Sequence, residues 1–553
     1  MSRTFRYTSL ALLVIVMVVS AVVAPATTKA QDFEPMSLAA ENCDYTGGGA
    51  GFKSIEAIDE LTVKFTLCTS DPAFPTKVAF SAFPINSSDY LEQTGGSGDL
   101  IDHPIGTGPY MLDTWTRGDS LTLKAYDGYW GEPAKEATLV FRWNSEGAAR
   151  LNELQAGTVD GIDNPSPDDF ATIRENSDLA LYDRPPLNVF YIGFNNTMEP
   201  FTDVRVRQAL AMGIDRQRIV DNFYPAGSIV ATQFMPPAIF GYTPEVSWYN
   251  FDPEAARALL ADAGYPDGFE LELSYRDVVR PYLPEPGRVA EDLQAQLAEN
   301  LGITVNINVM ESGAFIDAAN AGELPFYLLG WNADYPDATN FLDYHFGSGA
   351  TPQFGDLFPE ITAPLAEAGQ LSDPQARLAL YVTANQAIKD LVPMIPVAHG
   401  ASATAFRAAI TGAHASPLGN EYFGVMENPD GDQLVWMQNA EPIGLYCADE
   451  TDGESLRACE QINEALLSYQ VGGTAVEPAL AVSYEGNEDA TEWTFHLREG
   501  VTFHDGSTLD ANDVVESYIV QWDASSPLHV GRVGDFAYFN ALFGAYLNAP
   551  AAE

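Results

Sequence analysis

The stretch DPEAARALLADAG, residues 252–264, carries the signals of a short amphipathic helix. Asp252 is suited to cap the first turn, and Pro253 fits the first helical position because its missing N–H would have no partner there. The apolar residues fall on one face, at Ala255, Ala256, Leu259 and Leu260. Gly264 ends the pattern. The stretch therefore predicts a helix that packs one face on a core.

Other segments add both helices and strands. Helices are expected from about Asp203 through Leu210, and again after a cap at Asp215. Residues 61–67 alternate apolar and polar side chains, and so do residues 493–497, which is typical of half-buried strands. The chain has 553 residues, and a single core stops growing beyond roughly 250–300 residues. Mixed elements over this length predict an α/β protein of several domains.

The charge balance excludes some partners. Acidic residues outnumber basic ones 77 to 27, which gives a net charge of −50. Nucleic acids and anionic membrane surfaces both attract clustered Lys and Arg, so neither is expected as a partner. Such a charge keeps a protein soluble.

The N-terminus predicts export. Arg3 and Arg6 precede an apolar run, residues 10–24, that is shorter than the roughly 20 residues of a membrane span. Small residues follow, so residues 1–30 are interpreted as a signal peptide with cleavage after Ala30. No Cys follows closely, so no lipobox is expected, and the protein is placed in the periplasm or outside the cell. The alternative is a leader that is retained as an anchor.

Four cysteines in an exported chain allow two disulfides. Cys447 and Cys459 flank a loop-like sequence, Cys43 follows the leader and Cys68 ends a strand. We therefore predict the pairs Cys447–Cys459 and Cys43–Cys68, with buried free thiols as the alternative. Their spacing does not fit zinc.

No catalytic motif is present in the sequence. It lacks HExxH, G-x-S-x-G and a phosphate loop ending in Lys-Ser/Thr. The glycines of residues 105–110 are followed by Pro109, which has no N–H to donate, so they are interpreted as a turn. We expect no enzyme, no cofactor and no metal site. A secreted hydrolase is the remote alternative.

Several motifs, taken in order, resemble one family of exported binding proteins. They are HPIGTGPY at 103–110, YDGYW at 126–130, LQAGTVD at 154–160, PFTDVRVRQAL at 200–210, the capped helix at 252–265 and GWNADYPD at 330–337. Together they resemble the peptide- and nickel-type solute-binding proteins of ABC importers, family 5. The resemblance covers most of residues 100–425.

The order of the remaining blocks is unusual. FHLREGVTFHDG, residues 495–506, resembles a block that lies near the mature N-terminus in the family, yet here it follows everything else. Residues 433–442 resemble the family's first strand. Each block occurs once, which indicates a circular permutation whose old ends are joined through the turn-like residues 428–432. The order predicts that residues 52–90 pack beside residues 480–545. A mis-assembled gene is the alternative.

The resemblance implies a two-lobed α/β fold of the periplasmic-binding-protein type II, cluster C, with an additional subdomain on lobe one. Lobe one is expected to comprise residues 100–195 and 405–470, and lobe two residues 196–404. The extra subdomain is expected at residues 31–99 and 471–553. A hinge would close the lobes over the ligand.

The resemblance also implies a function and a site. A monomer would capture small peptides or related solutes and deliver them to a membrane permease; a sugar or nickel complex is the alternative ligand. In the resembling peptide binders the Asp of this Trp-x-Ala-Asp stretch pairs with the ligand's α-ammonium, which carries over to Asp334. The remaining expected ligand-binding residues are Trp331, Asn332, Tyr335 and Glu441. Asp337 is instead expected to cap a helix over residues 338–346. Arg276 and Arg280 are named for the ligand's carboxylate without a feature that selects either.

Overall fold

The computed structural model describes residues 33–46, 50–278, 280–532, 534 and 536–549. The expected signal peptide, residues 1–30, lies outside the described residues. Residues from Pro35 onward form one compact unit. Among the described residues, no helix combines the length and the apolar character that a membrane span requires.

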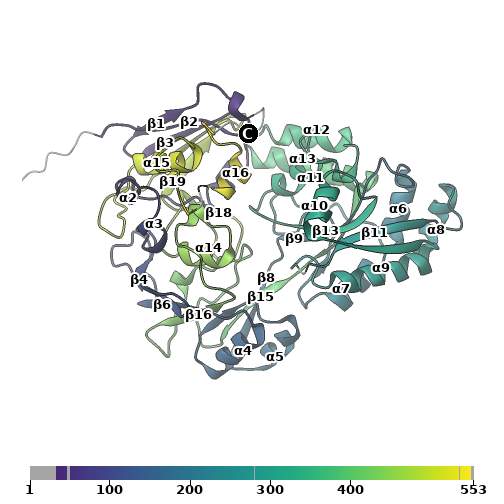
Figure 1. The fold of residues 1–553 in the computed structure, drawn as a ribbon, viewed down its shortest axis with the longest axis horizontal. Helices are drawn as coiled ribbons and strands as arrows, with labels where there is room; N and C mark the ends of the chain where they lie inside the picture. The colour runs from purple at the N-terminus through teal and green to yellow at the C-terminus, as the bar shows by residue number, and fades with distance from the viewer. Residues whose placement is uncertain (1–32, 47–49, 279, 533, 535, 550–553) are drawn as a thin grey trace, which may run out of the picture. The chain divides into compact units, whose positions relative to one another are not determined.

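Lobe one is built on a seven-stranded sheet (Figure 1). Its strand order is β4 (Tyr110–Thr116), β5 (Ser120–Ala125), β6 (Thr138–Trp143), β16 (Leu434–Gln438), β7 (Gly161–Asp163), β15 (Ser402–Arg407) and β8 (Leu179–Arg184). Helix α4 (Gly147–Ala156) packs against β7 and β15, and α5 (Phe170–Glu175) packs against β8. The sheet thus joins segments that are about 300 residues apart in the chain.

Lobe two is built on a six-stranded sheet. Its order is β10 (Ile229–Val230), β14 (Met394–His399), β9 (Asn188–Phe194), β13 (Phe326–Asn332), β11 (Glu270–Arg276) and β12 (Thr304–Met310). Helix α9 (Pro286–Leu301) covers β11 and β12 (Figure 1). The strands β11, β12 and β13 run parallel, so their carboxyl ends meet at one edge.

The three helices predicted from caps are present in lobe two. They are α6 (Val204–Gly213), α7 (Arg216–Phe223) and α8 (Pro253–Asp262). Each N-cap carboxylate accepts a backbone N–H of the first turn: Asp203 from Arg205, Asp215 from Arg218 and Asp252 from Ala255. These bonds satisfy donors that a helix end leaves without partners.

A third subdomain combines the two ends of the described chain. Its sheet has the order β1 (Ser37–Ala39), β2 (Phe52–Asp59), β3 (Thr62–Leu67), β20 (Glu492–Leu497) and β19 (Ala481–Gly486). Helix α15 (Ala511–Trp522) packs on it, so the purple and yellow ends of the chain lie together in Figure 1. Phe52, Phe65 and Tyr518 form its aromatic core. The packing expected between residues 52–90 and 480–545 is therefore observed, while the permutation itself stays a prediction.

Two short segments connect lobe one to lobe two. Residues 185–187 join β8 to β9, and residues 400–401 join β14 to β15. The Asn188 side chain ties the two segments, because it donates to the Gly400 carbonyl and accepts from the Gly400 N–H, both at 2.8 Å. The sheet order assigns β9 to lobe two and all of β15 to lobe one. The lobes thus meet at these segments, whereas the sequence analysis placed the boundaries after residues 195 and 404. The sequence of β9 does not reveal which sheet the strand joins.

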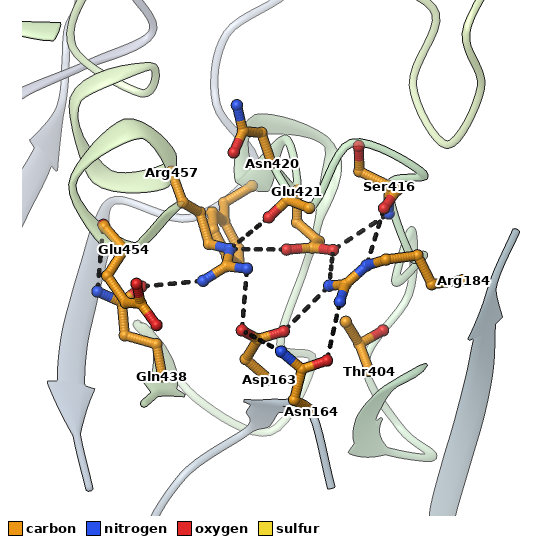
Figure 2. A network of polar contacts seen from close by, with 12 residues as sticks. Asp163, Asn164, Arg184, Thr404, Ser416, Asn420, Glu421, Gln438, Glu454 and Arg457 are labelled. Carbon is orange, nitrogen blue, oxygen red and sulfur yellow. Dashed lines mark hydrogen bonds and ion pairs between the residues drawn. The ribbon is translucent and has the colours of Figure 1, made fainter. Parts of the chain in front are cut away.

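A buried ion quartet lies in lobe one beside the first of these segments (Figure 2). Arg184 pairs with Asp163 at 3.0 Å and with Glu421 at 2.7 Å. Arg457 pairs with the same two carboxylates at 3.0 and 2.8 Å. Burial alone would raise the pKa of Asp163, yet the charges of Arg457 and Arg184 hold that pKa below its usual value. Two cations and two anions leave the quartet neutral.

The structure contains two disulfides. Cys43 is bonded to Cys68 and Cys447 to Cys459, with Cα separations of 5.7 and 5.8 Å. These are the pairs that the sequence predicts. The first lies in the third subdomain, and the second closes the loop that leads into α14 (Gly453–Cys459) in lobe one.

Candidate functional site

A pocket of about 310 Å³ opens in lobe two at the carboxyl ends of its parallel strands. Open α/β sheets bind ligands at such edges, because loops there converge from several strands. Arg276 ends β11 and Asn332 ends β13, and both line the pocket. Asp334 and Trp331 line it as well, so three of the five residues predicted to bind ligand, Trp331, Asn332 and Asp334, come together here.

Asp334 is the acid of this pocket. Its carboxylate Oδ2 accepts a hydrogen bond at 2.9 Å from the side chain of Asn340, and no ion pair to it is found among the described residues. Burial raises the pKa of Asp334, against the opposing effect of the Asn340 hydrogen bond. Asp334 is half-buried, and a carboxylate that is partly removed from water without an ion-pair partner favours a cationic ligand group.

Asn340, which the sequence analysis did not single out, holds this stretch in place. Its Oδ1 accepts from the backbone N–H of Asp334 at 2.9 Å and from the indole N–H of Trp331 at 3.2 Å. Asn340 lies in a π-helical turn, Thr339–Asp343. The Asn340 amide thus orients both Asp334 and Trp331. No sequence motif predicts this role for an Asn six positions after Asp334.

An aromatic wall adjoins the acid. The indole of Trp331 stacks on Tyr344 with ring centroids 4.3 Å apart. The buried ring of His345 meets the edge of Trp331 at 5.0 Å, and its Nδ1 bonds the Phe341 carbonyl. Burial lowers the pKa of His345 to about 3, so this ring is neutral at physiological pH. The wall is therefore flat, rigid and uncharged.

Two guanidinium groups complete the pocket. Arg276 and Arg280 both line it, and Arg276 donates to the Tyr282 hydroxyl at 3.1 Å. One carboxylate and two guanidinium groups on a single wall complement a ligand that carries both an ammonium and a carboxylate. The sequence analysis considered both arginines as partners of the ligand's carboxylate, but no sequence feature selected them.

Tyr335 and Asp337 point away from this pocket. Tyr335 is buried, accepts from the Thr339 hydroxyl and lies under the Lys77 ammonium, 5.1 Å from its ring centre. Asp337 forms a buried ion pair with Arg377 at 2.6 Å. It also accepts from the Thr339 N–H, but the helix cap is Ala338, so the expected N-cap role is corrected to a tertiary ion pair. The partner lies 40 residues downstream, where no local pattern reveals it.

Glu441 is also not part of this pocket. Its carboxylate accepts from the Trp115 indole N–H at 3.2 Å and from the Gly118 N–H at 3.1 Å. These partners belong to the β4–β5 hairpin of lobe one. Glu441 thus contacts this hairpin and does not line the pocket of Asp334, and its expected contact with ligand stays a prediction.

Asp334 also acts on residues outside lobe two. Burial, and to a lesser extent the charges of Asp334 and of Asp452 in lobe one, raise the pKa of Tyr538 to about 12. Tyr538 lies in α16 (Ala537–Phe543) of the third subdomain. The charge of Asp334 therefore reaches a residue of the third subdomain.

Comparisons with known proteins agree with this architecture. The model of the bacterial extracellular solute-binding proteins, family 5, matches residues 24–353 and 475–531. The dipeptide-binding protein of Escherichia coli K12 is 31% identical over 376 residues, which cover 67% of this chain and 70% of that protein. The heme-binding protein A of Haemophilus influenzae is 32% identical over 379 residues, covering 67% and 69%.

Solved structures give the same result. HbpA2 from Haemophilus parasuis aligns with a TM-score of 0.66 and 34% identity over 70% of this chain and 77% of its own. A dipeptide-binding protein from Pseudoalteromonas sp. SM9913 in complex with Met-Leu aligns with a TM-score of 0.53 and 27% identity, covering 70% and 77%. The fold and pocket define a bilobed solute-binding protein. The chain belongs to the bacterial extracellular solute-binding proteins, family 5.

Proposed function

We propose that this protein captures short peptides between its two lobes and delivers them to the membrane permease of an ABC importer. It acts by binding, without catalysis, as an exported monomer. The observation that carries the proposal is that Asp334 and the two guanidinium groups of Arg276 and Arg280 line one pocket. A zwitterionic peptide presents the complementary ammonium and carboxylate.

Binding and closure are coupled in this account. The pocket wall belongs to lobe two, and the two crossing segments at residues 185–187 and 400–401 are the only short links to lobe one among the described residues. A peptide that touches both lobes favours the closed state by its differential affinity. Relatives of this chain are named for dipeptides, which supports a ligand of that size.

The test is calorimetric titration of short peptides into wild type and Asp334→Asn. The substitution keeps the shape of the side chain and removes its charge. Loss of one partner of a buried charge pair costs about 2–5 kcal/mol, so affinity should fall roughly 30-fold to several thousand-fold. The matched control is Asp262→Asn, which makes the same change at an exposed acid of lobe two outside the pocket and should leave affinity close to wild type. Unchanged peptide affinity in Asp334→Asn would remove Asp334 from this role, and binding of N-acetylated peptides as tightly as free ones would do the same.

A further inference from the structure

A second cavity, of about 220 Å³, is lined by residues of lobe one and of the third subdomain and shares no lining residue with the pocket of Asp334. Its walls combine four aromatic side chains and two carboxyl groups: Tyr129, Trp130, Tyr422, Tyr469, Glu460 and Glu464. The cavity also borders the ion quartet. Ser416 and Asn420 line the cavity and lie beside the quartet in Figure 2. Since a water molecule takes about 30 Å³ of liquid, the cavity has room for a small organic molecule.

The quartet leaves no cation for this cavity. Arg457 donates to Asp163, Glu421, the Gln438 side chain and the Gly419 carbonyl. Arg184 is similarly occupied by Asp163, Glu421 and three other acceptors, which are the Ser416 carbonyl, the Asn164 side chain and the Ser402 hydroxyl. The quartet is neutral by itself, so its two cations do not neutralise a negative charge on Glu460 or Glu464.

Glu460 has one carboxyl oxygen without a partner. Its Oε2 atom is buried and has no hydrogen-bond partner in the described part of the chain. Burial first, and then the charge of Glu421, raise the pKa of Glu460 to about 8, while Asn420 and Arg457 act in the opposite direction. An acceptor that is buried without a donor is costly, so a ligand that donates there would be stabilised.

Glu464 is held by three donors. It accepts from the Tyr129 hydroxyl at 2.9 Å, the Trp130 indole at 2.8 Å and the Thr107 hydroxyl at 2.9 Å. Burial raises the pKa of Glu464 to about 7, and those donors and Arg498 lower it. Arg498 lies 4.0 Å from the Trp130 ring centre and donates to the Ala479 carbonyl.

Three tyrosines, one histidine and a third glutamate also line the cavity. Burial and the charges of Glu464 and Glu460 raise the pKa of Tyr422 to about 12. Burial and the charge of Glu460 raise the pKa of Tyr469 well above its usual value. His414 accepts from the Tyr422 N–H through Nε2, so its proton lies on Nδ1, which bonds the Gly412 carbonyl. Glu477 lies at the exposed rim.

We propose that this cavity is a second binding site and that it takes a small organic ammonium ion. The ammonium would donate to the free oxygen of Glu460 and lie near Glu464, and its alkyl part would contact the aromatic walls, which also attract cations. The cavity is larger than a bare metal ion requires, and the described residues include no group of three His, Cys, Asp or Glu side chains that could hold one. The site is separate from peptide capture and does not depend on it.

The test uses ethylammonium chloride and its neutral isostere ethanol, titrated into the full-length protein by calorimetry at constant ionic strength. At pH 8.5 we expect one ethylammonium per chain and no binding of ethanol. Because the two carboxyl groups become protonated on acidification, ethylammonium affinity should fall at least tenfold at pH 6. Pairs of buffers with different ionisation enthalpies should reveal proton release on binding at pH 7.

Variants separate this site from the peptide site. Glu460→Gln should weaken ethylammonium at least tenfold and leave peptide affinity unchanged, whereas Asp334→Asn should do the reverse. The exposed Glu254→Gln, which changes net charge equally, should alter neither. Absence of ethylammonium binding, equal affinity in Glu460→Gln, or binding without proton release and pH dependence would each overturn the proposal. The proton-release measurement on wild type decides the matter if Glu460→Gln does not fold.

Discussion

The ion quartet of lobe one makes a sharp prediction about stability. In Asp163→Asn the side chain keeps its shape, but Arg184 and Arg457 lose one of their two shared anions, whose oxygens lie 3.0 Å from each guanidinium, and keep only Glu421. The side chains of all four members are at least 92% buried. Breaking a buried pair by removing one partner costs about 3–5 kcal/mol, because the remaining charge stays buried.

The assay is urea unfolding followed by fluorescence and circular dichroism, and we expect the unfolding free energy to fall by about 3–5 kcal/mol. The matched control is Asp430→Asn, which breaks an ion pair with Arg407 at 3.3 Å whose carboxylate is 63% exposed. That change should cost no more than about 1 kcal/mol. Adding Arg457→Met to Asp163→Asn should recover part of the loss. Equal effects of the buried and exposed variants would refute the reasoning.

The quartet also has a defined pH dependence. The folded-state pKa of Asp163 is lower than the unfolded value, so its contribution is present above about pH 4 and is lost as pH falls through the folded pKa. The difference in unfolding free energy between wild type and Asp163→Asn should therefore shrink on acidification below about pH 4. A difference that stays constant to the lowest accessible pH would contradict this sign.

Further predictions concern a disulfide and a buried acid. Cys447→Ser opens a bridge that spans 12 positions and should cost about 2–4 kcal/mol, less than reductant costs wild type, in which it opens both bridges; an unchanged urea midpoint would contradict it. Asp343, whose Oδ2 is buried without a hydrogen-bond partner among the described residues, has a pKa raised to about 8, mainly by burial and then by Asp337. Its folded-state pKa is above the unfolded one, so its favourable contribution exists at low pH and is lost as pH rises from about 4 to 8. Asp343→Asn should therefore gain stability relative to wild type by up to about 1.4 kcal/mol per pH unit across that window, and a flat difference would contradict this.

The sequence predicted local structure well because caps and alternation act over a few residues. Asp203, Asp215 and Asp252 each cap the helix that follows, as their positions indicate. The strand at residues 62–67 and its partner at 492–497 also follow from alternation, although their pairing came from the block order. The α/β class follows from these elements.

The sequence could not predict features that depend on distant partners. The role of Asp337 depends on Arg377, and that of Glu441 on Trp115, and neither pair has a local pattern. The strand β9 is buried at every position, so its membership of lobe two appeared only through its pairing with β13 and β14. Likewise, Asn340 and the second cavity required coordinates.

The central claim is that the protein binds an amine-bearing solute through Asp334. The most direct measurement is native mass spectrometry of the exported protein, before and after unfolding, with wild type and Asp334→Asn both incubated with a mixture of short peptides. We predict one bound peptide per wild-type chain, released on unfolding and lost in Asp334→Asn. A wild-type protein that binds no peptide from the mixture, or that carries a solute without an amine, would contradict the account.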